Sequence, residues 1–218
     1  MGGCGMKERP ILFNTEMVKS ILEGRKTQTR RILNCDHPVV TGFVPNGIYG
    51  YWKGTAKSDA VIQQYISTFP FTIKCPFGLV GDRLWVRETF RLFDSDECPH
   101  ADFPCGCPSW GTPLYRASHD CFDGEKWTPS IHMPRSASRI LLEITNIRIE
   151  RLNDISSDDA KAEGFDYSTH PSSIEMGYAI GAKTNFRFTW EQIYGQNAWN
   201  KNPWVWVVEF RLIEGGAA

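Results

Sequence analysis

The longest strand-like stretch of the chain is RILLEITNIRIERL, which occupies residues 139–152. Apolar side chains alternate with charged or polar ones over most of it, which is the pattern of a β-strand buried on one face. A strand of this length seldom stays straight, so we expect a bend near Thr145-Asn146, at the corner of a barrel. The stretch therefore predicts a fold built mainly from β-strands.

Neighbouring segments also favour strands. Residues 203–213 are almost continuously apolar and predict a closing strand buried on both faces or nearly so. Residues 83–90 alternate, and Glu88 falls on the same face as the apolar residues of that segment. Short strands and turns are expected at 34–70, and one more strand at 113–117.

Three segments carry helix signals. The first can be capped by Asn14 or Thr15 and is ended by Gly24. The second, at residues 156–164, has a serine cap, an acidic first turn and a terminal glycine. The third covers residues 186–194 and stops before a glycine.

These elements predict an α+β fold that is mainly β: a small barrel with short helices packed on its outside. The Cys- and Pro-rich residues at about 90–135 are expected to form a large irregular insertion. We expect a single domain over residues 6–218, and an N-terminal extension or cloning remnant at residues 1–5.

The composition narrows the class of protein. The chain has 218 residues, and 24 Lys and Arg balance 25 Asp and Glu to give a net charge of -1, which excludes a polycationic tail-like protein. No apolar run is long enough to span a bilayer and the start does not read as a secretory signal, so a cytoplasmic protein without membrane partners is expected. The 7 cysteines, an odd number, favour free thiols in a reducing compartment.

The densest polar motif is GRKTQTRR at residues 24–31, with four cations and two hydroxyls. One interpretation is a solvated surface turn. The other is a site for phosphate or for a polarised carbonyl, because apolar residues on both sides anchor the backbone. Lys26 could also serve as base to a neighbouring threonine hydroxyl if burial left its amine neutral.

Two further regions are candidates for ligand contacts. Glu88 is either a site carboxylate or the partner of a nearby arginine. The stiff segment at 127–135 presents Trp127, His132 and Arg135, which suit a base and its phosphate. The alternative is that Trp127 and Met133 plug the barrel and His132 makes a structural hydrogen bond.

A cysteine cluster in the insertion could hold a metal. Cys98, His100, Cys105 and Cys107 could complete a tetrahedral structural zinc site, although their spacing is not that of the usual zinc knuckle. Free thiols in a loop are the alternative. We expect no required cofactor beyond such a zinc ion.

The segment ILEGRKTQTRR at residues 21–31 resembles the signature of the ASCH domains, which are relatives of the PUA RNA-binding fold. Further segments resemble a phage and prophage branch of that family, and they spread over nearly the whole chain: residues 9–13, 81–88, 127–135, 160–164 and 202–207. The resemblance implies a PUA-like barrel.

Some ASCH proteins deacetylate N4-acetylcytidine with a Lys, a Thr three residues later and a Glu on a later helix. The resemblance places these roles on Lys26, Thr29 and Glu163. Thr29 would be the nucleophile, Lys26 its base, and Glu163 would orient the lysine or protonate the departing amine. Arg31 would hold the substrate or stabilise the oxyanion. This chain is about twice as long as those enzymes.

Three functions therefore stay open. The first is a binding protein for RNA or a modified nucleotide, with a nucleotide-sized pocket around residues 24–31. Its surface would present Lys26, Arg30, Arg31, Trp127 and Arg135. The second is an amidohydrolase of acylated cytidine-like nucleosides. The third, more distant, is a ribonuclease. A near-neutral charge fits a single-nucleotide pocket better than a long nucleic acid.

Overall fold

In a computed structural model, the chain is described at residues 6–33, 38–44, 47–53, 66–94, 107–119, 126–165 and 181–215. The strands are β1 (Glu8–Leu12), β2 (Gln28–Ile32), β3 (Pro38–Val44), β4 (Gly47–Lys53), β5 (Ile66–Lys74), β6 (Arg83–Arg87), β7 (Phe90–Leu92), β8 (Pro113–Tyr115), β9 (Ile140–Arg151) and β10 (Trp204–Gly215). The helices are α1 (Thr15–Leu22), α2 (Ser157–Ala162) and α4 (Ala182–Tyr194), with short 3-10 turns η2 (Ser130–His132), η3 (Arg135–Ala137) and η4 (Leu152–Asp154).

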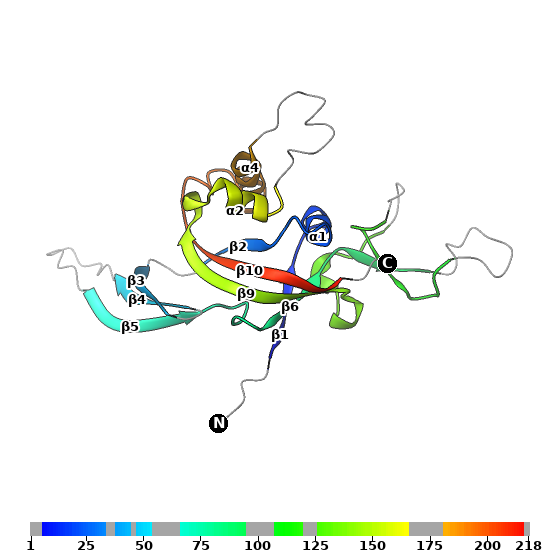
Figure 1. Ribbon diagram of the computed structural model, residues 1–218, viewed down its shortest axis with the longest axis horizontal. Coiled ribbons are helices and arrows are strands. Elements are labelled where there is room, and N and C mark those ends of the chain that lie inside the picture. Colours follow the sequence, from blue (N-terminus) through cyan, green and yellow to red (C-terminus); the bar gives the residue numbers. More distant parts are fainter. Residues whose placement is uncertain are drawn as a thin grey trace, which may run out of the picture.

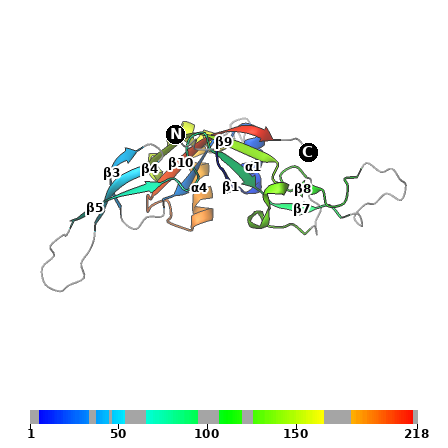
Figure 2. The same ribbon diagram turned by 90° about the horizontal axis from the view of Figure 1, so that it is seen from below.

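A mixed five-stranded sheet in the order β1-β6-β9-β10-β2 forms the centre of the molecule (Figure 1). Its β1 and β6 run parallel, and the other neighbours are antiparallel. Two smaller sheets, β3-β4-β5 and β7-β8, lie toward opposite ends of the molecule in both Figure 1 and Figure 2. The α+β class expected from the sequence is confirmed.

The long strand β9 bends where the sequence predicts a bend. Opposite β10, Glu209 pairs with Asn146 and Phe210 pairs with Ile144, so Thr145 is left over as a β-bulge. The two strands curve together across the molecule (Figure 1).

The two cores lie on opposite faces of β10. Trp206, Val208 and Phe210 belong to a core shared with β1, β6, β9 and the buried face of α1. Val205 and Val207 belong to the other core, under α2 and α4. The prediction that this strand is buried on both faces is therefore correct.

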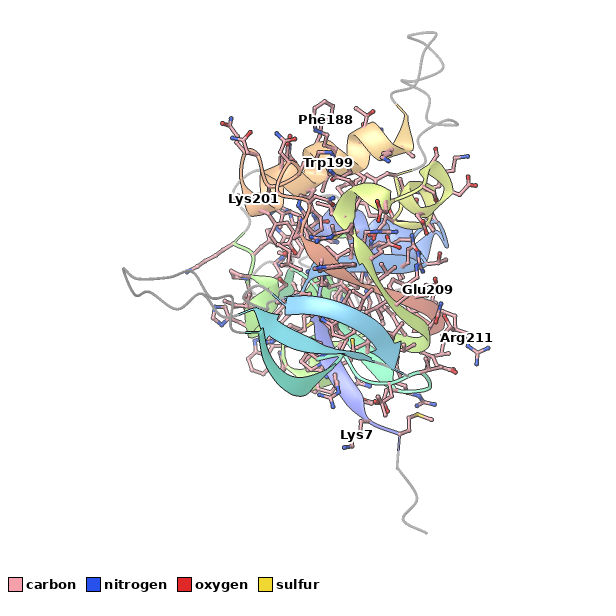
Figure 3. The ribbon with its side chains drawn as sticks, turned by 90° about the vertical axis from the view of Figure 1, so that its left-hand side faces the viewer. Lys7, Phe188, Trp199, Lys201, Glu209 and Arg211 are labelled. Atoms are coloured by element: carbon pink, nitrogen blue, oxygen red, sulfur yellow. The ribbon has the colours of Figure 1, made fainter. Side chains whose placement is uncertain are left out.

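Helix α4 begins earlier than the sequence predicts. It starts at Ala182 rather than 186, and it ends at Tyr194 before Gly195 as expected. Its buried side chains Ala182, Phe186 and Trp190 are spaced four apart, which is one face of a helix. Figure 3 shows Phe188 on the outer side of this helix, away from the sheet.

The described strands do not form the closed barrel that the sequence analysis predicts. The outer strands β1 and β2 are joined through α1 and do not pair with each other. In place of a ladder, α1 contributes Val18 and Ile21 to the core, and the Arg31 side chain donates to the Leu12 carbonyl at 2.5 Å. The result is a curved open sheet.

None of the helices in the described ranges has both the length and the apolarity needed to cross a bilayer. Of the proposed zinc ligands, Cys98, His100 and Cys105 lie outside the described residues, and Cys107 lies inside them. Within the described ranges, no group of three or more His, Cys, Asp or Glu side chains is placed to hold a metal.

Candidate functional site

The GRKTQTRR motif turns the chain from α1 into β2. Glu23 caps the helix, and Gly24 follows with a φ of +73°, a left-handed conformation that favours glycine. The backbone N–H groups of Arg25 and Lys26 then both donate to the Ser20 carbonyl. This tight turn aims the Lys26 side chain inward, beneath the end of α1.

Lys26 is fully buried, and its ammonium group has three acceptors. Its Nζ donates to the Gln28 carbonyl at 2.9 Å, to the Glu163 carbonyl at 2.9 Å and to Glu163 Oε2 at 2.7 Å. The Lys26 side chain is 0% exposed and the Glu163 side chain is 3% exposed. An ammonium group has three protons to donate, so the described contacts satisfy all of them.

Glu163 is positioned by the end of α2. Ser156 caps the start of this helix in a reciprocal capping box with Asp159, and Glu163 is the C-cap residue directly after Ala162. Gly164 follows at φ +95°, where an added Cβ would lie 2.9 Å from Ser20 Cβ. Because only glycine fits there, the end of α2 can approach α1 and Lys26 closely.

Arg30 links Glu163 to a wider set of charges. Its Nη1 donates to Glu163 Oε1 at 3.1 Å, and its Nε donates to Glu150 at 2.8 Å. Arg148 binds Glu150 and Asp159 at 3.2 and 2.8 Å. The network joins β2, β9 and α2, and it leaves neither Lys26 nor Arg30 available to a solvent-side phosphate.

Burial and pairing shift the pKa values of this network. Burial lowers the pKa of Lys26, against the opposing effect of Glu163. Burial alone would raise the pKa of Asp159, but hydrogen bonds from Gln28 and Ser156, and the charges of Arg30 and Arg148, lower that pKa to about 2.

Two adjoining pockets lie between α1, the end of α2 and α4. The larger pocket, of about 150 Å³, is lined by Ser20 and Gln192 among others. The smaller pocket, of about 20 Å³, is lined by Thr29, Arg30, Arg31 and Trp190 among others. Four residues line both pockets: Met17, Glu163, Phe165 and Thr189.

The structure brings together the residues on which the hydrolase interpretation depends. Thr29 is buried in β2 and shares the smaller pocket with Glu163, which contacts Lys26 directly. Arg30 and Arg31 line the same pocket. The surface turn considered for this motif is wrong for Lys26, Thr29 and Arg30, which are at most 3% exposed.

Glu88 lies elsewhere. It is buried, and its carboxylate accepts hydrogen bonds from Arg139 Nε at 2.9 Å and from Arg139 Nη2 at 3.1 Å. Burial raises the pKa of Glu88, and the paired guanidinium opposes that rise. The expected pairing with a nearby arginine is confirmed, and Glu88 lines neither pocket.

The segment at 127–135 also lies away from both pockets. Met133 is buried against Phe90 in a small cluster of its own, and the described strands form no closed barrel for it to plug. The half-buried Trp127 lies 5.5 Å from the Arg91 guanidinium. His132 is exposed, and the exposed Arg135 pairs with Glu8 at 2.9 Å.

Several site residues were not predicted from the sequence. Gln28, Asp159 and Arg148 complete the polar network, and Trp190 lines the smaller pocket. The four-residue spacing of Phe186 and Trp190 is a signal that could have placed Trp190 on a buried helix face. For the network partners, only the fold reveals the proximity.

No protein-family model, curated protein or solved structure matches the chain. A buried lysine in contact with a carboxylate, beside a pocket that contains a threonine, is suited to moving a proton to and from a hydroxyl nucleophile.

Proposed function

We propose that the protein is an amidohydrolase that removes a small acyl group from an acylated, cytidine-like nucleoside. Thr29 is the nucleophile, Lys26 its base, and Glu163 the group that returns the proton to the departing amine. The observation that supports this is the fully buried Lys26–Glu163 pair, 2.7 Å apart, beside the pocket that Thr29 lines.

The pair can supply a neutral base. A proton that passes from Lys26 Nζ to Glu163 Oε2 leaves an amine and a carboxylic acid, which bury more easily than two ions. Burial already lowers the pKa of Lys26, which favours the neutral amine.

The reaction then balances in two steps. Thr29 Oγ gives its proton to Lys26 and bonds to the acyl carbon, the amide C–N bond breaks, and the amine takes the proton from Glu163. Water then hydrolyses the acyl–threonine ester and releases the carboxylic acid. The pair returns to its ionic form after each turnover.

The nucleoside class and the finer fold rest on the ASCH resemblance. We assign the curved sheet, with α1 between its outer strands, to a PUA-like ASCH architecture. The larger pocket, at about 150 Å³, is below the roughly 300 Å³ of typical ligand sites, so it fits part of a nucleoside rather than a whole nucleotide.

The test is release of cytidine from N4-acetylcytidine, followed by chromatography, for the parent protein and for Thr29→Ala. The matched control is Thr27→Ala, because Thr27 is an exposed threonine of the same motif and lines neither pocket. We expect release by the parent and by Thr27→Ala, and loss with Thr29→Ala. Equal rates for the two variants would contradict the nucleophile role.

A binding protein for a modified nucleotide is the second candidate. It is favoured by the saturation of Lys26, whose three donors are all engaged, and by Arg30, which donates to the other carboxylate oxygen of Glu163. Such a protein would bind N4-acetylcytidine without releasing cytidine, and Thr29→Ala would bind it as well as the parent does.

A further inference from the structure

The smaller pocket contains hydrogen-bond donors that lack acceptors. Arg31 Nε and Trp190 Nε1 are both buried, and neither has a hydrogen-bond partner within the described part of the chain. Both residues line this pocket together with Thr29. Two unsatisfied donors beside one small cavity are unusual, since nearly all buried polar groups in folded proteins are paired.

Each of these donors is held in place by its other contacts. Arg31 Nη2 donates to the Leu12 carbonyl, and its guanidinium lies 5.4 Å from the centre of the Phe13 ring. Trp190 is 3% exposed, and its ring centre lies 4.3 Å from that of Tyr194. An unpaired buried donor costs about 1–3 kcal/mol, so an acceptor atom bound in this pocket would be stabilised by both donors.

The size of the pocket indicates which acceptor. At about 20 Å³ it holds little more than one water-sized group, and cannot hold a ring. The unpaired groups are donors, and the carboxylate of Glu163 is engaged by Lys26 and Arg30. The pocket therefore suits a single neutral or developing negative oxygen.

We propose that this pocket is the carbonyl-oxygen subsite of the reaction, in which Trp190 Nε1 and Arg31 Nε donate to the acyl oxygen of the substrate. The assignment of Trp190 rests on the proposed function. The donors bind the oxygen as it gains charge during attack by Thr29. The amine side of the substrate occupies the larger pocket.

The direct test is to titrate N4-acetylcytidine into the ¹⁵N-labelled Thr29→Ala protein. This variant should bind the nucleoside without turning it over. The chain has 8 tryptophans, and the indole signal of Trp190 is assigned by its loss in Trp190→Phe. We expect the Trp190 indole proton to move downfield on binding. If other signals move and this one does not, the subsite assignment is wrong while the proposed function stands. If no signal moves, the proposed substrate class and the subsite both fail.

A kinetic test separates hydrogen bonding from packing. Trp190→Phe keeps an aromatic ring but loses the N–H, and should lower kcat/KM about 10- to 100-fold, since one such donor commonly contributes 10²–10³-fold and Arg31 remains. The matched control is Trp199→Phe, a buried tryptophan of the same core that lines neither pocket, with an expected change below about threefold.

The thioamide analogue of the substrate sharpens this comparison, because sulfur is a weak acceptor. The penalty of Trp190→Phe should largely disappear with the thioamide. A penalty that is equal for amide and thioamide would show that Trp190 acts by packing alone, and would overturn the assignment.

Discussion

Lys26 is the residue on which the site depends most, and its burial makes it measurable by stability as well as by activity. Replacing it in Lys26→Met would leave Glu163 with Arg30 as its described cation and would leave two backbone carbonyls without their donor. Breaking one side of a buried ion pair commonly costs 3–5 kcal/mol. We expect a loss of about that size in the free energy of unfolding, measured with urea.

The control for that loss is Lys19→Met. Lys19 lies on α1 and pairs with Glu16 at 3.4 Å. Both side chains of this i,i+3 pair are exposed to solvent. Such pairs contribute little, so the change should stay within about 0.5 kcal/mol. Equal losses in the two variants would mean that the buried pair contributes no more to stability than a surface pair.

Asp159 gives a prediction for pH. Its pKa in the folded protein, about 2, lies below the ordinary 3.8, so the folded state binds fewer protons than the unfolded state over that interval. Its stabilising effect is complete above about pH 5 and is lost as the pH falls toward 2. Asp159→Asn should therefore destabilise the protein at pH 6, by up to about 2 kcal/mol, and much less near pH 2.

Asp158→Asn is the matched control for this experiment. Asp158 follows the same helix cap, but its side chain is 94% exposed and its pairing with Lys161 is loose, at 3.7 Å. Urea midpoints measured from pH 6 to pH 2 should show a pH-dependent gap for Asp159→Asn only. A gap that stays constant with pH would contradict the role assigned to the ionised Asp159.

Among the elements, α2 depends on one glycine for its close approach to α1. Gly164→Ala places a Cβ 2.9 Å from Ser20 Cβ in a backbone with φ +95°. Gly24→Ala has a similar backbone strain, with φ +73°, but no atom within 4 Å of the added Cβ. We expect Gly24→Ala to cost about 1 kcal/mol and Gly164→Ala to cost more, and also to lower activity by displacing Glu163.

Thermal unfolding measures the loss of stability in the two variants, and cytidine release measures the loss of activity. The comparison isolates the steric contribution, because both substitutions introduce the same side chain at a positive φ. Equal stability and full activity in the two variants would show that the end of α2 tolerates displacement, and that the position of Glu163 is not fixed by this contact.

The sequence predicts elements well where local chemistry decides them. The bend at Thr145, the cap at Ser156 and the end of α1 at Gly24 follow from length, capping and turn residues. The start of α4 was missed because Ala182 to Asn185 carry no cap side chain, the N-cap being Gly181. That helix start depends on packing against the second core.

The candidate site divides in the same way. Lys26, Thr29 and Glu163 follow from a motif and its family resemblance, and the structure brings them together. Glu88 and Trp127 have the right chemistry but lie at another place, since pairing with Arg139 and with Arg91 decides their positions. Side-chain type alone does not show which of several arginines a residue will meet.

At the scale of the whole molecule, the expected barrel does not form, and this too depends on long-range contacts that local sequence does not show. Alternation and bending in β9 indicate a curved sheet, but closure requires that β1 and β2 meet, and their order in the sheet is a long-range property. The polar network instead ties the sheet to α2, through pairs such as Arg30–Glu150 and Arg148–Asp159. Glu209 of β10 is another partner of Arg148, and Figure 3 shows it on the same side of the molecule as Arg211.

The electrostatics of the whole protein give the last prediction. The net charge is -1, and two of the four cations of the motif are buried in ion pairs: Lys26 with Glu163, and Arg30 with Glu163 and Glu150. A protein that contacts 6–10 phosphates loses about 10³–10⁵-fold in affinity between 50 and 200 mM salt. We expect the affinity of the Thr29→Ala protein for N4-acetylcytidine to change less than about threefold over that range, because a neutral ligand releases few counterions.

The matched measurement uses single-stranded RNA that contains N4-acetylcytidine. A steep salt dependence together with much tighter binding of the RNA would show that the protein reads a polynucleotide, with its phosphate contacts outside the Lys26 site.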